Sequence, residues 1–169
     1  MAKSINNIIF LASAICFLSF LGLAYGNSHF VVEGKIYCDT CRIQFITKLT
    51  TYLKGAKVRL ECMEREGGAI TFSAEAETDA TGAYQIPVVG DHEEEICKIT
   101  LLSSPDADCN EIKKDPWAKK AAQITLTSNN GIASSVRAAN PIGFMKKQAL
   151  PECIGVLRDM GFNAHGVMP

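Results

Sequence analysis

Most of the chain alternates apolar and polar residues with a period of two, the pattern of a β-strand with one buried face. The alternation is clean at 57–62, where Val58, Leu60 and Cys62 share one face. It also places Ile70, Phe72, Ala74 and Ala76 together, and Tyr84, Ile86 and Val88 together. We therefore expect strands at 30–37, 57–62, 70–77, 83–89, 96–102, 123–127 and 134–138.

Residues typical of turns separate these runs. Glycine or aspartate occurs at 66–68, 79–82 and 90–95, and Asn129-Asn130-Gly131 predicts a hairpin. Two stretches lack the alternation, 103–122 and 140–151, and we expect them to be loops pinned by Cys109 and Cys153. The prediction is an all-β fold, a small antiparallel barrel or sandwich of about seven strands. One or two helical turns are expected within 154–162, followed by a frayed tail.

The first 26 residues have the order of a secretory signal peptide. Lys3 precedes an almost wholly apolar run at 8–23, and Ala24-Tyr25-Gly26 supplies small residues at the cleavage positions. The alternative is an uncleaved membrane anchor, for which the run is slightly short. We expect a single domain over residues 27–169 that is secreted to the extracellular space. The formal net charge of −1 gives no basic footprint for nucleic acid.

Seven cysteines are present, and Cys16 would leave with the signal peptide. The other six, an even number in an oxidising compartment, predict three disulfides. They are Cys38, Cys41, Cys62, Cys97, Cys109 and Cys153. Their spacing does not select one pairing. Distant partners for Cys38 and Cys41 would close long loops, which constrains the unfolded chain most.

The Cys38-Asp39-Thr40-Cys41 segment has two other interpretations. A redox motif needs a strand before it and a helix after it, and 42–47 is a poor start for a helix. A structural zinc site would need a second close pair of ligands, which the remaining cysteines and histidines do not supply.

No motif indicates an enzyme, a cofactor or a metal. The three histidines, His29, His92 and His165, belong to no hydrolase or metalloprotease pattern. The acidic run at 91–95 lacks the spaced ligands of a calcium loop and is expected to be a solvated hairpin tip.

Two segments are candidates for binding a partner. Trp117 lies among lysines that include Lys119 and Lys120, so an exposed indole there could anchor a protein or a glycan. The alternative is a Trp packed over the open side of the barrel. In the second segment Phe144 precedes Lys146 and Lys147, and Phe144 could either meet a partner or cover the core.

Six segments together resemble the olive-pollen major allergen family, also called the pollen Ole e I allergen and extensin family. They are 32–42 (VEGKIYCDTCR), 78–84 (TDATGAY), 90–97 (GDHEEEIC), 108–109 (DC), 139–147 (ANPIGFMKK) and 150–153 (LPEC). The resemblance covers nearly all of the expected mature domain and places all six cysteines.

The resemblance implies a non-enzymatic extracellular plant protein with a small β-barrel and the pairs Cys38–Cys109, Cys41–Cys153 and Cys62–Cys97. It also implies a role in pollen, where some relatives are allergens and some act in pollen-tube growth by binding a receptor kinase. Two features depart from the family. The chain has no Asn-x-Ser/Thr acceptor for an N-glycan, and its six prolines form no extensin-like tract.

The function expected is therefore that of a secreted binding or signalling module, recognised by a cell-surface receptor or wall component in pollen or reproductive development. A structural wall protein held by Trp117 and its lysines is the alternative. A thiol oxidoreductase using Cys38 and Cys41 is a third hypothesis.

Overall fold

The computed structural model describes residues 29–112 and 121–162. The predicted signal peptide, the 163–169 tail and the candidate residues Trp117, Lys119 and Lys120 lie outside the described residues.

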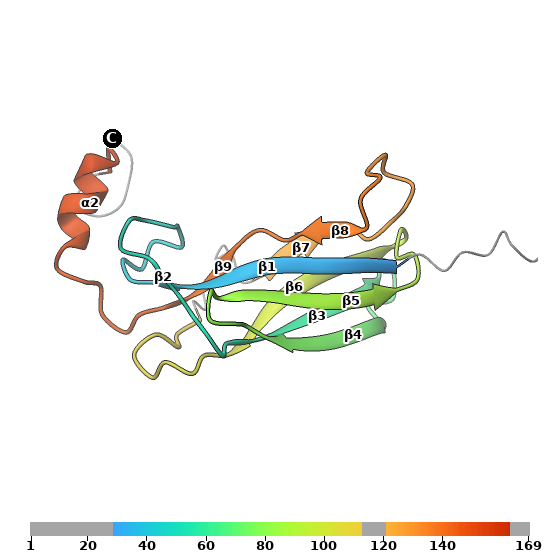
Figure 1. The fold of residues 1–169 in the computed structure, drawn as a ribbon, viewed down its shortest axis with the longest axis horizontal. Helices are drawn as coiled ribbons and strands as arrows, with labels where there is room; N and C mark the ends of the chain where they lie inside the picture. The colour runs from blue at the N-terminus through green and yellow to red at the C-terminus, as the bar shows by residue number, and fades with distance from the viewer. Residues whose placement is uncertain (1–28, 113–120, 163–169) are drawn as a thin grey trace, which may run out of the picture.

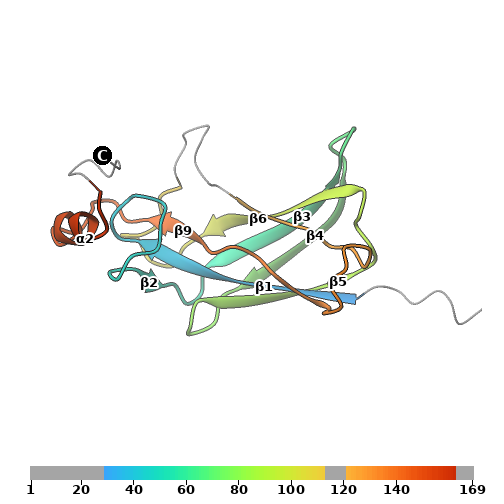
Figure 2. The same ribbon diagram turned by 90° about the horizontal axis from the view of Figure 1, so that it is seen from above.

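Two β-sheets face each other (Figure 1). In the first, β1 (His29–Asp39) pairs with β2 (Thr51–Tyr52), β5 (Ala83–Val89), β8 (Val136–Ala138) and β9 (Ile142–Met145). In the second, the strand order is β4 (Ile70–Glu77), β3 (Lys57–Glu64), β6 (Glu95–Ser103) and β7 (Ala121–Ile124). The short helix α2 (Cys153–Asp159) lies at the end of the sandwich away from the start of β1 (Figures 1 and 2).

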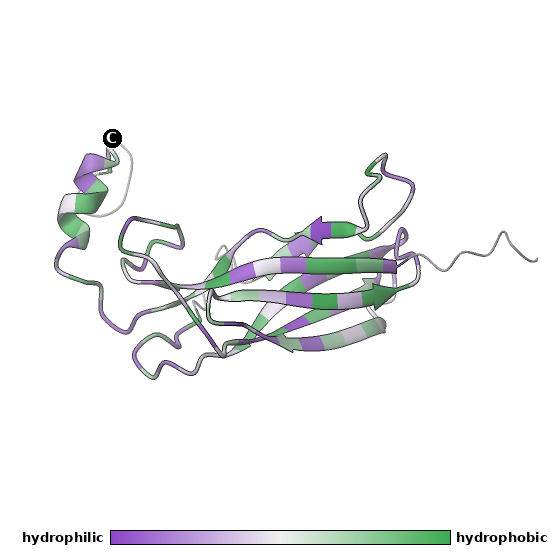
Figure 3. Ribbon diagram, viewed as in Figure 1, coloured by the Kyte–Doolittle hydropathy of each residue, from purple (hydrophilic) through white to green (hydrophobic). Residues whose placement is uncertain are grey.

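The core lies between the sheets and is built from the alternating positions that the sequence shows. Val58, Leu60 and Cys62 of β3 are fully buried, and Tyr84, Ile86 and Val88 of β5 face them from the first sheet. Apolar and polar residues alternate along the strands (Figure 3). The predicted strands at 57–62, 70–77, 83–89 and 96–102 are therefore confirmed, with ends shifted by two residues at most.

The predicted all-β sandwich is confirmed, and its strand pairs are antiparallel except for two. β8 and β9 both run parallel to β1, with Val32 opposite Arg137 and Cys38 opposite Phe144. The segment at 140–151, expected to be a loop, contains β9. Three of the four β9 residues are buried, so the period of two that would have marked a strand is absent.

The hairpin predicted at Asn129-Asn130-Gly131 is also wrong. The turn forms, with Gly131 at φ +76°. However, it lies between β7 of the second sheet and β8 of the first, so the strands on either side do not pair. Turn residues specify a local reversal of the chain, whereas the choice of sheet depends on distant partners.

Three disulfides join the pairs that the family resemblance implies. Cys38–Cys109 and Cys41–Cys153 lie near α2, and Cys62–Cys97 links β3 to β6. No helix follows Cys41; Arg42 and Gln44 instead have φ of 60° and 58°.

Among the described residues, no helix is long and apolar enough to cross a bilayer.

Candidate functional site

Two disulfides gather distant parts of the chain at one end of the sandwich. We call this the clamped end and define it as residues 40–50, 104–111 and 146–160. The Cys41–Cys153 bridge spans 112 residues of sequence and ties the start of α2 to the loop after β1. The Cys38–Cys109 bridge spans 71 residues and ties the 104–111 segment to β1.

Asp39 organises the loop after β1 from inside. Its side chain is 1% exposed, and its carboxylate accepts hydrogen bonds from the backbone N–H groups of Cys41 and Gln44 at 3.2 and 2.5 Å. These bonds fix the turn in which Arg42 and Gln44 take positive φ, a conformation that non-glycine residues adopt only when their surroundings support it. Burial, and then the charge of Asp39, raises the pKa of the nearby Tyr37 to about 12.

Arg42 joins three segments of the clamped end. Its Nη1 lies 2.6 Å from a carboxylate oxygen of Glu111 and also donates to the backbone oxygens of Lys146 and Lys147. Because this ion pair is partly exposed, it contributes little by Coulomb energy alone. Its main effect is to hold the 146–147 backbone in place.

The predicted basic pair Lys146 and Lys147 belongs to this end. Lys146 is half-buried and Lys147 exposed, and both line a shallow hollow with Asp108 and Gln148. Lys147 Nζ lies 3.9 Å from Asp108, but the Lys147 side chain is 54% exposed and so remains accessible to a partner.

Phe144 does not share this surface. Its side chain is 1% exposed and belongs to the core between the sheets. The interpretation of Phe144 as a partner-binding residue is therefore wrong, and the alternative, that it covers the core, describes its position. The sequence alone could not distinguish the two interpretations, because an apolar residue in a short segment without periodicity can be either buried or exposed.

The clamped end carries exposed apolar side chains that sequence reasoning did not single out. Phe45 is 55% exposed and Ile154 57% exposed. Ile46 and Met160 line a hollow beside α2, with the Lys48–Asp159 ion pair of 3.1 Å at the same place. Exposed apolar groups gathered in one region mark interaction sites. The only signal in the sequence was Phe45-Ile46, an apolar pair in a segment with no period.

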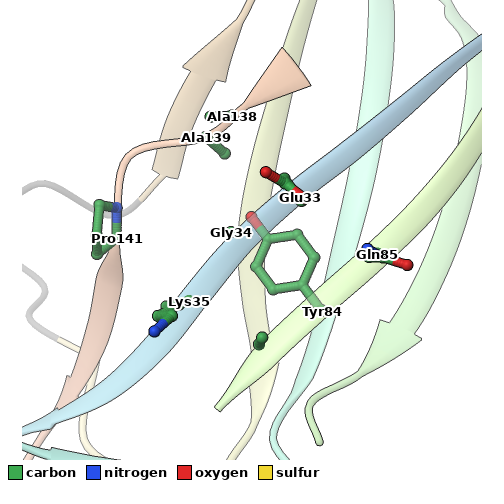
Figure 4. A pocket seen from close by; sticks show the side chains of 9 residues that line it. Glu33, Gly34, Lys35, Tyr84, Gln85, Ala138, Ala139 and Pro141 are labelled. Carbon is green, nitrogen blue, oxygen red and sulfur yellow. The ribbon is translucent and has the colours of Figure 1, made fainter. Parts of the chain in front are cut away.

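A third hollow, of about 240 Å³, lies beside β1, where β8 ends at Ala138 and β9 begins at Ile142. Its lining comprises Glu33, Gly34, Lys35, Ala83, Tyr84, Gln85, Ala138, Ala139 and Pro141. The Tyr84 ring lies across β1 at Gly34 with its hydroxyl directed toward the Ala138 side (Figure 4). That hydroxyl has no hydrogen-bond partner among the described residues, and burial raises the pKa of Tyr84.

The acidic run at 91–95 is solvated at Asp91, Glu93 and Glu94, as expected, but it is not a hairpin tip, because β5 and β6 belong to different sheets. Asp91 accepts hydrogen bonds from the Ser128 backbone N–H at 3.0 Å and the Thr127 hydroxyl at 3.2 Å. These hydrogen bonds lower the pKa of Asp91, and the bond from Ser128 has the largest effect. Within the run only His92 is buried, at 9% exposed, and it packs inward.

Cys38 and Cys41 bond to other cysteines, not to each other, and are 2% and 5% exposed. The thiol-oxidoreductase hypothesis needs the two sulfurs to form one exposed redox pair, and this arrangement does not provide it.

The structure thus defines a small disulfide-linked β-sandwich with loops clamped at one end. The family model described as "Pollen protein Ole e 1 like" matches residues 28–161. The chain belongs to this family, as the segments containing its cysteines indicated.

Named relatives extend over nearly the whole chain. An Olee1-like protein of Betula pendula is 61% identical over 168 residues, covering 99% of both chains. The anther-specific protein LAT52 of Solanum lycopersicum is 44% identical, covering 90% of this chain and 94% of LAT52. The crystal structure of the major plantain pollen allergen Pla l 1 matches with a TM-score of 0.67 at 35% identity, covering 74% of this chain and 99% of that one.

Proposed function

We propose that this chain is a secreted, non-enzymatic recognition module whose clamped end binds a cell-surface receptor or wall component in pollen or reproductive tissue. The proposal rests on one observation: at the clamped end, segments held by disulfides also carry exposed apolar side chains. Two disulfides and the Arg42 contacts hold the loops and α2 there, and these segments present Phe45, Ile46 and Ile154 to solvent.

This combination suits binding because a rigid loop loses little conformational entropy when a partner immobilises it. Apolar anchors at the same end of the sandwich as Lys146 and Lys147 offer a partner both desolvation energy and electrostatic attraction. The family's pollen and anther proteins support the tissue, and the six paired cysteines support export to an oxidising compartment.

The test is saturable binding of the labelled folded protein to two preparations from pollen tubes, intact protoplasts and isolated wall fragments. Saturable binding to either one supports the proposal, and the arm that binds distinguishes a receptor from a wall component. The double substitution Phe45→Ser and Ile46→Ser should weaken it about tenfold or more, the scale of losing a principal anchor.

The matched control is Ile132→Ser with Val136→Ser, which removes two exposed apolar residues, 51% and 41% exposed, outside the clamped end. This control should change affinity less than about twofold, a small fraction of a tenfold loss. Absence of saturable binding to both preparations, or an equal loss in the control, would overturn the proposal.

A further inference from the structure

Four side chains with metal-binding atoms meet on the inner face of the second sheet, away from the clamped end. Cys62 of β3 and Cys97 of β6 are directly opposite each other and almost fully buried. Glu95 lies two residues before Cys97 and so points to the same face. His92 comes from the connection before β6, and the ligand atoms of all four residues lie within 4.8 Å of one another.

Contacts of both the backbone and the imidazole ring hold His92 in this group. Its N–H donates to the Leu126 carbonyl at 2.8 Å, and its Nδ1 lies 2.8 Å from a carboxylate oxygen of Glu95. The ring packs on Phe72 with centroids 5.5 Å apart. The remaining nitrogen, Nε2, is buried and has no hydrogen-bond partner among the described residues.

An unpartnered nitrogen in a buried imidazole is an unusual feature. Buried polar atoms are nearly always paired, so such an atom calls for a ligand, a water or a second state of the site. The imidazole belongs to a group with two sulfurs and a carboxylate, the donor set that proteins use for zinc, and its Nδ1 is the nitrogen that lies against Glu95.

We propose that, when the Cys62–Cys97 disulfide is reduced, Cys62, Cys97, His92 and Glu95 bind one Zn²⁺ in a tetrahedral site. The disulfide and the metal are then alternative states of the same four residues. Two thiolates, one imidazole nitrogen and one carboxylate oxygen complete the coordination without an external ligand.

The chemistry balances with a dithiol as reductant. The dithiol delivers two electrons and two protons by thiol–disulfide exchange, becomes a cyclic disulfide and leaves two cysteine thiols. Zn²⁺ then displaces both thiol protons into the buffer, because the thiolate is the metal ligand. With the disulfide closed, each sulfur is bonded to the other and neither thiolate exists.

The geometry requires only modest rearrangement. Zinc bonds of roughly 2.0–2.3 Å hold tetrahedral ligand atoms roughly 3–4 Å apart. The two Cys side chains must therefore rotate away from each other, and the other ligands must shift by roughly 1 Å, a distance set by the same bond lengths.

The test is a Co²⁺ titration of the full chain in a dithiol reductant, because cobalt occupies zinc sites and absorbs when thiolates coordinate it. We expect one tightly bound Co²⁺, displaced by Zn²⁺, with thiolate-to-cobalt charge-transfer absorption. The Cys62→Ser and Cys97→Ser double variant should lose the signal. The matched double variant at Cys38 and Cys109 removes the same number of thiols and should retain it.

His92→Ala and Glu95→Gln distinguish a built site from thiols of an unfolded chain, since such thiols would not need either residue. Each should weaken Co²⁺ binding about tenfold or more, whereas His29→Ala should leave it unchanged. Zn²⁺ should also protect Cys62 and Cys97, but not Cys38, from alkylation read by mass spectrometry. Retained binding in the Cys62/Cys97 variant, unchanged affinity without His92, or equal protection of all cysteines would overturn the proposal.

Discussion

The ring of Tyr84 on β5 covers Gly34, its register partner on β1. A Cβ built at position 34 would lie 2.4 Å from the Tyr84 hydroxyl oxygen and 2.8 Å from the ring carbon that bears it. Tyr84 is 2% exposed and belongs to the core. Both residues lie in the segments that resemble the pollen allergen family, and packing accounts for them: Gly34 leaves a space that the Tyr84 ring fills.

Gly34→Ala should therefore destabilise the protein. The new methyl group must displace a ring that the core holds in place, at a cost of about 1–3 kcal/mol in the free energy of unfolding. Urea unfolding measures it, and Tyr84→Phe, which removes the nearest atom, should restore part of the loss. Gly155→Ala is the control, because nothing lies within 4 Å of a Cβ there and alanine favours the helix. Equal effects at 34 and 155 would contradict the packing account.

Alkaline pH should lower stability through the buried tyrosines. Burial raises the pKa of Tyr84, and burial together with Asp39 raises that of Tyr37 to about 12. The unfolded chain ionises its tyrosines near pH 10, so above that pH the folded state holds more protons. The free energy of unfolding should be insensitive to these groups below about pH 10 and should fall above it. The measurement is the free energy of unfolding at several pH values between about 8 and 12, a range that includes the pKa of tyrosine in the unfolded chain. This free energy should fall less steeply with pH in Tyr84→Phe than in the unmodified protein. An equally steep fall would exclude a contribution from Tyr84.

Arg137→Lys should weaken the fold much more than the same change at Arg59. Arg137 is 5% exposed, stacks 4.8 Å above Phe30 and donates to backbone carbonyls, including that of Thr127 at 2.9 Å. An ammonium cannot reproduce this planar set of donors, so we expect a loss of about 2–3 kcal/mol. Arg59 pairs with Glu75 in solvent, and Arg59→Lys should give no measurable change in thermal unfolding. A stability loss at position 59 comparable to that at 137 would show that burial is not the cause.

Removing the Cys41–Cys153 bridge should release the clamped end more than the sheets. The bridge closes a loop of 112 residues, for which the chain-entropy model gives about 4–5 kcal/mol. In the Cys41→Ser and Cys153→Ser double variant, hydrogen exchange should accelerate most over 42–50 and α2. Strands β3 and β6, joined by their own disulfide, should retain relative protection. Uniform acceleration across the chain would mean that the bridge acts on global stability alone.

Local patterns in the sequence were sufficient for the regular part of this fold. The alternation in β3 and β5 identifies both the strands and their buried faces, because one face of each strand meets the core and the other meets solvent. The six cysteines indicated three disulfides, and the resemblance to the family, not their spacing, indicated the pairs that the structure contains.

Tertiary structure alone decided the features on which function depends. β9 escaped detection because three of its four residues are buried, and Phe144 lies in the core whereas Lys146 and Lys147 line a surface hollow. The exposure of Phe45 and the meeting of His92 with Cys62 and Cys97 depend on segments far apart in the chain. A period of two indicates only that alternate residues of a strand face the core. A clamped loop or a buried group of ligands is formed by contacts between distant segments, and those segments share no pattern in the sequence.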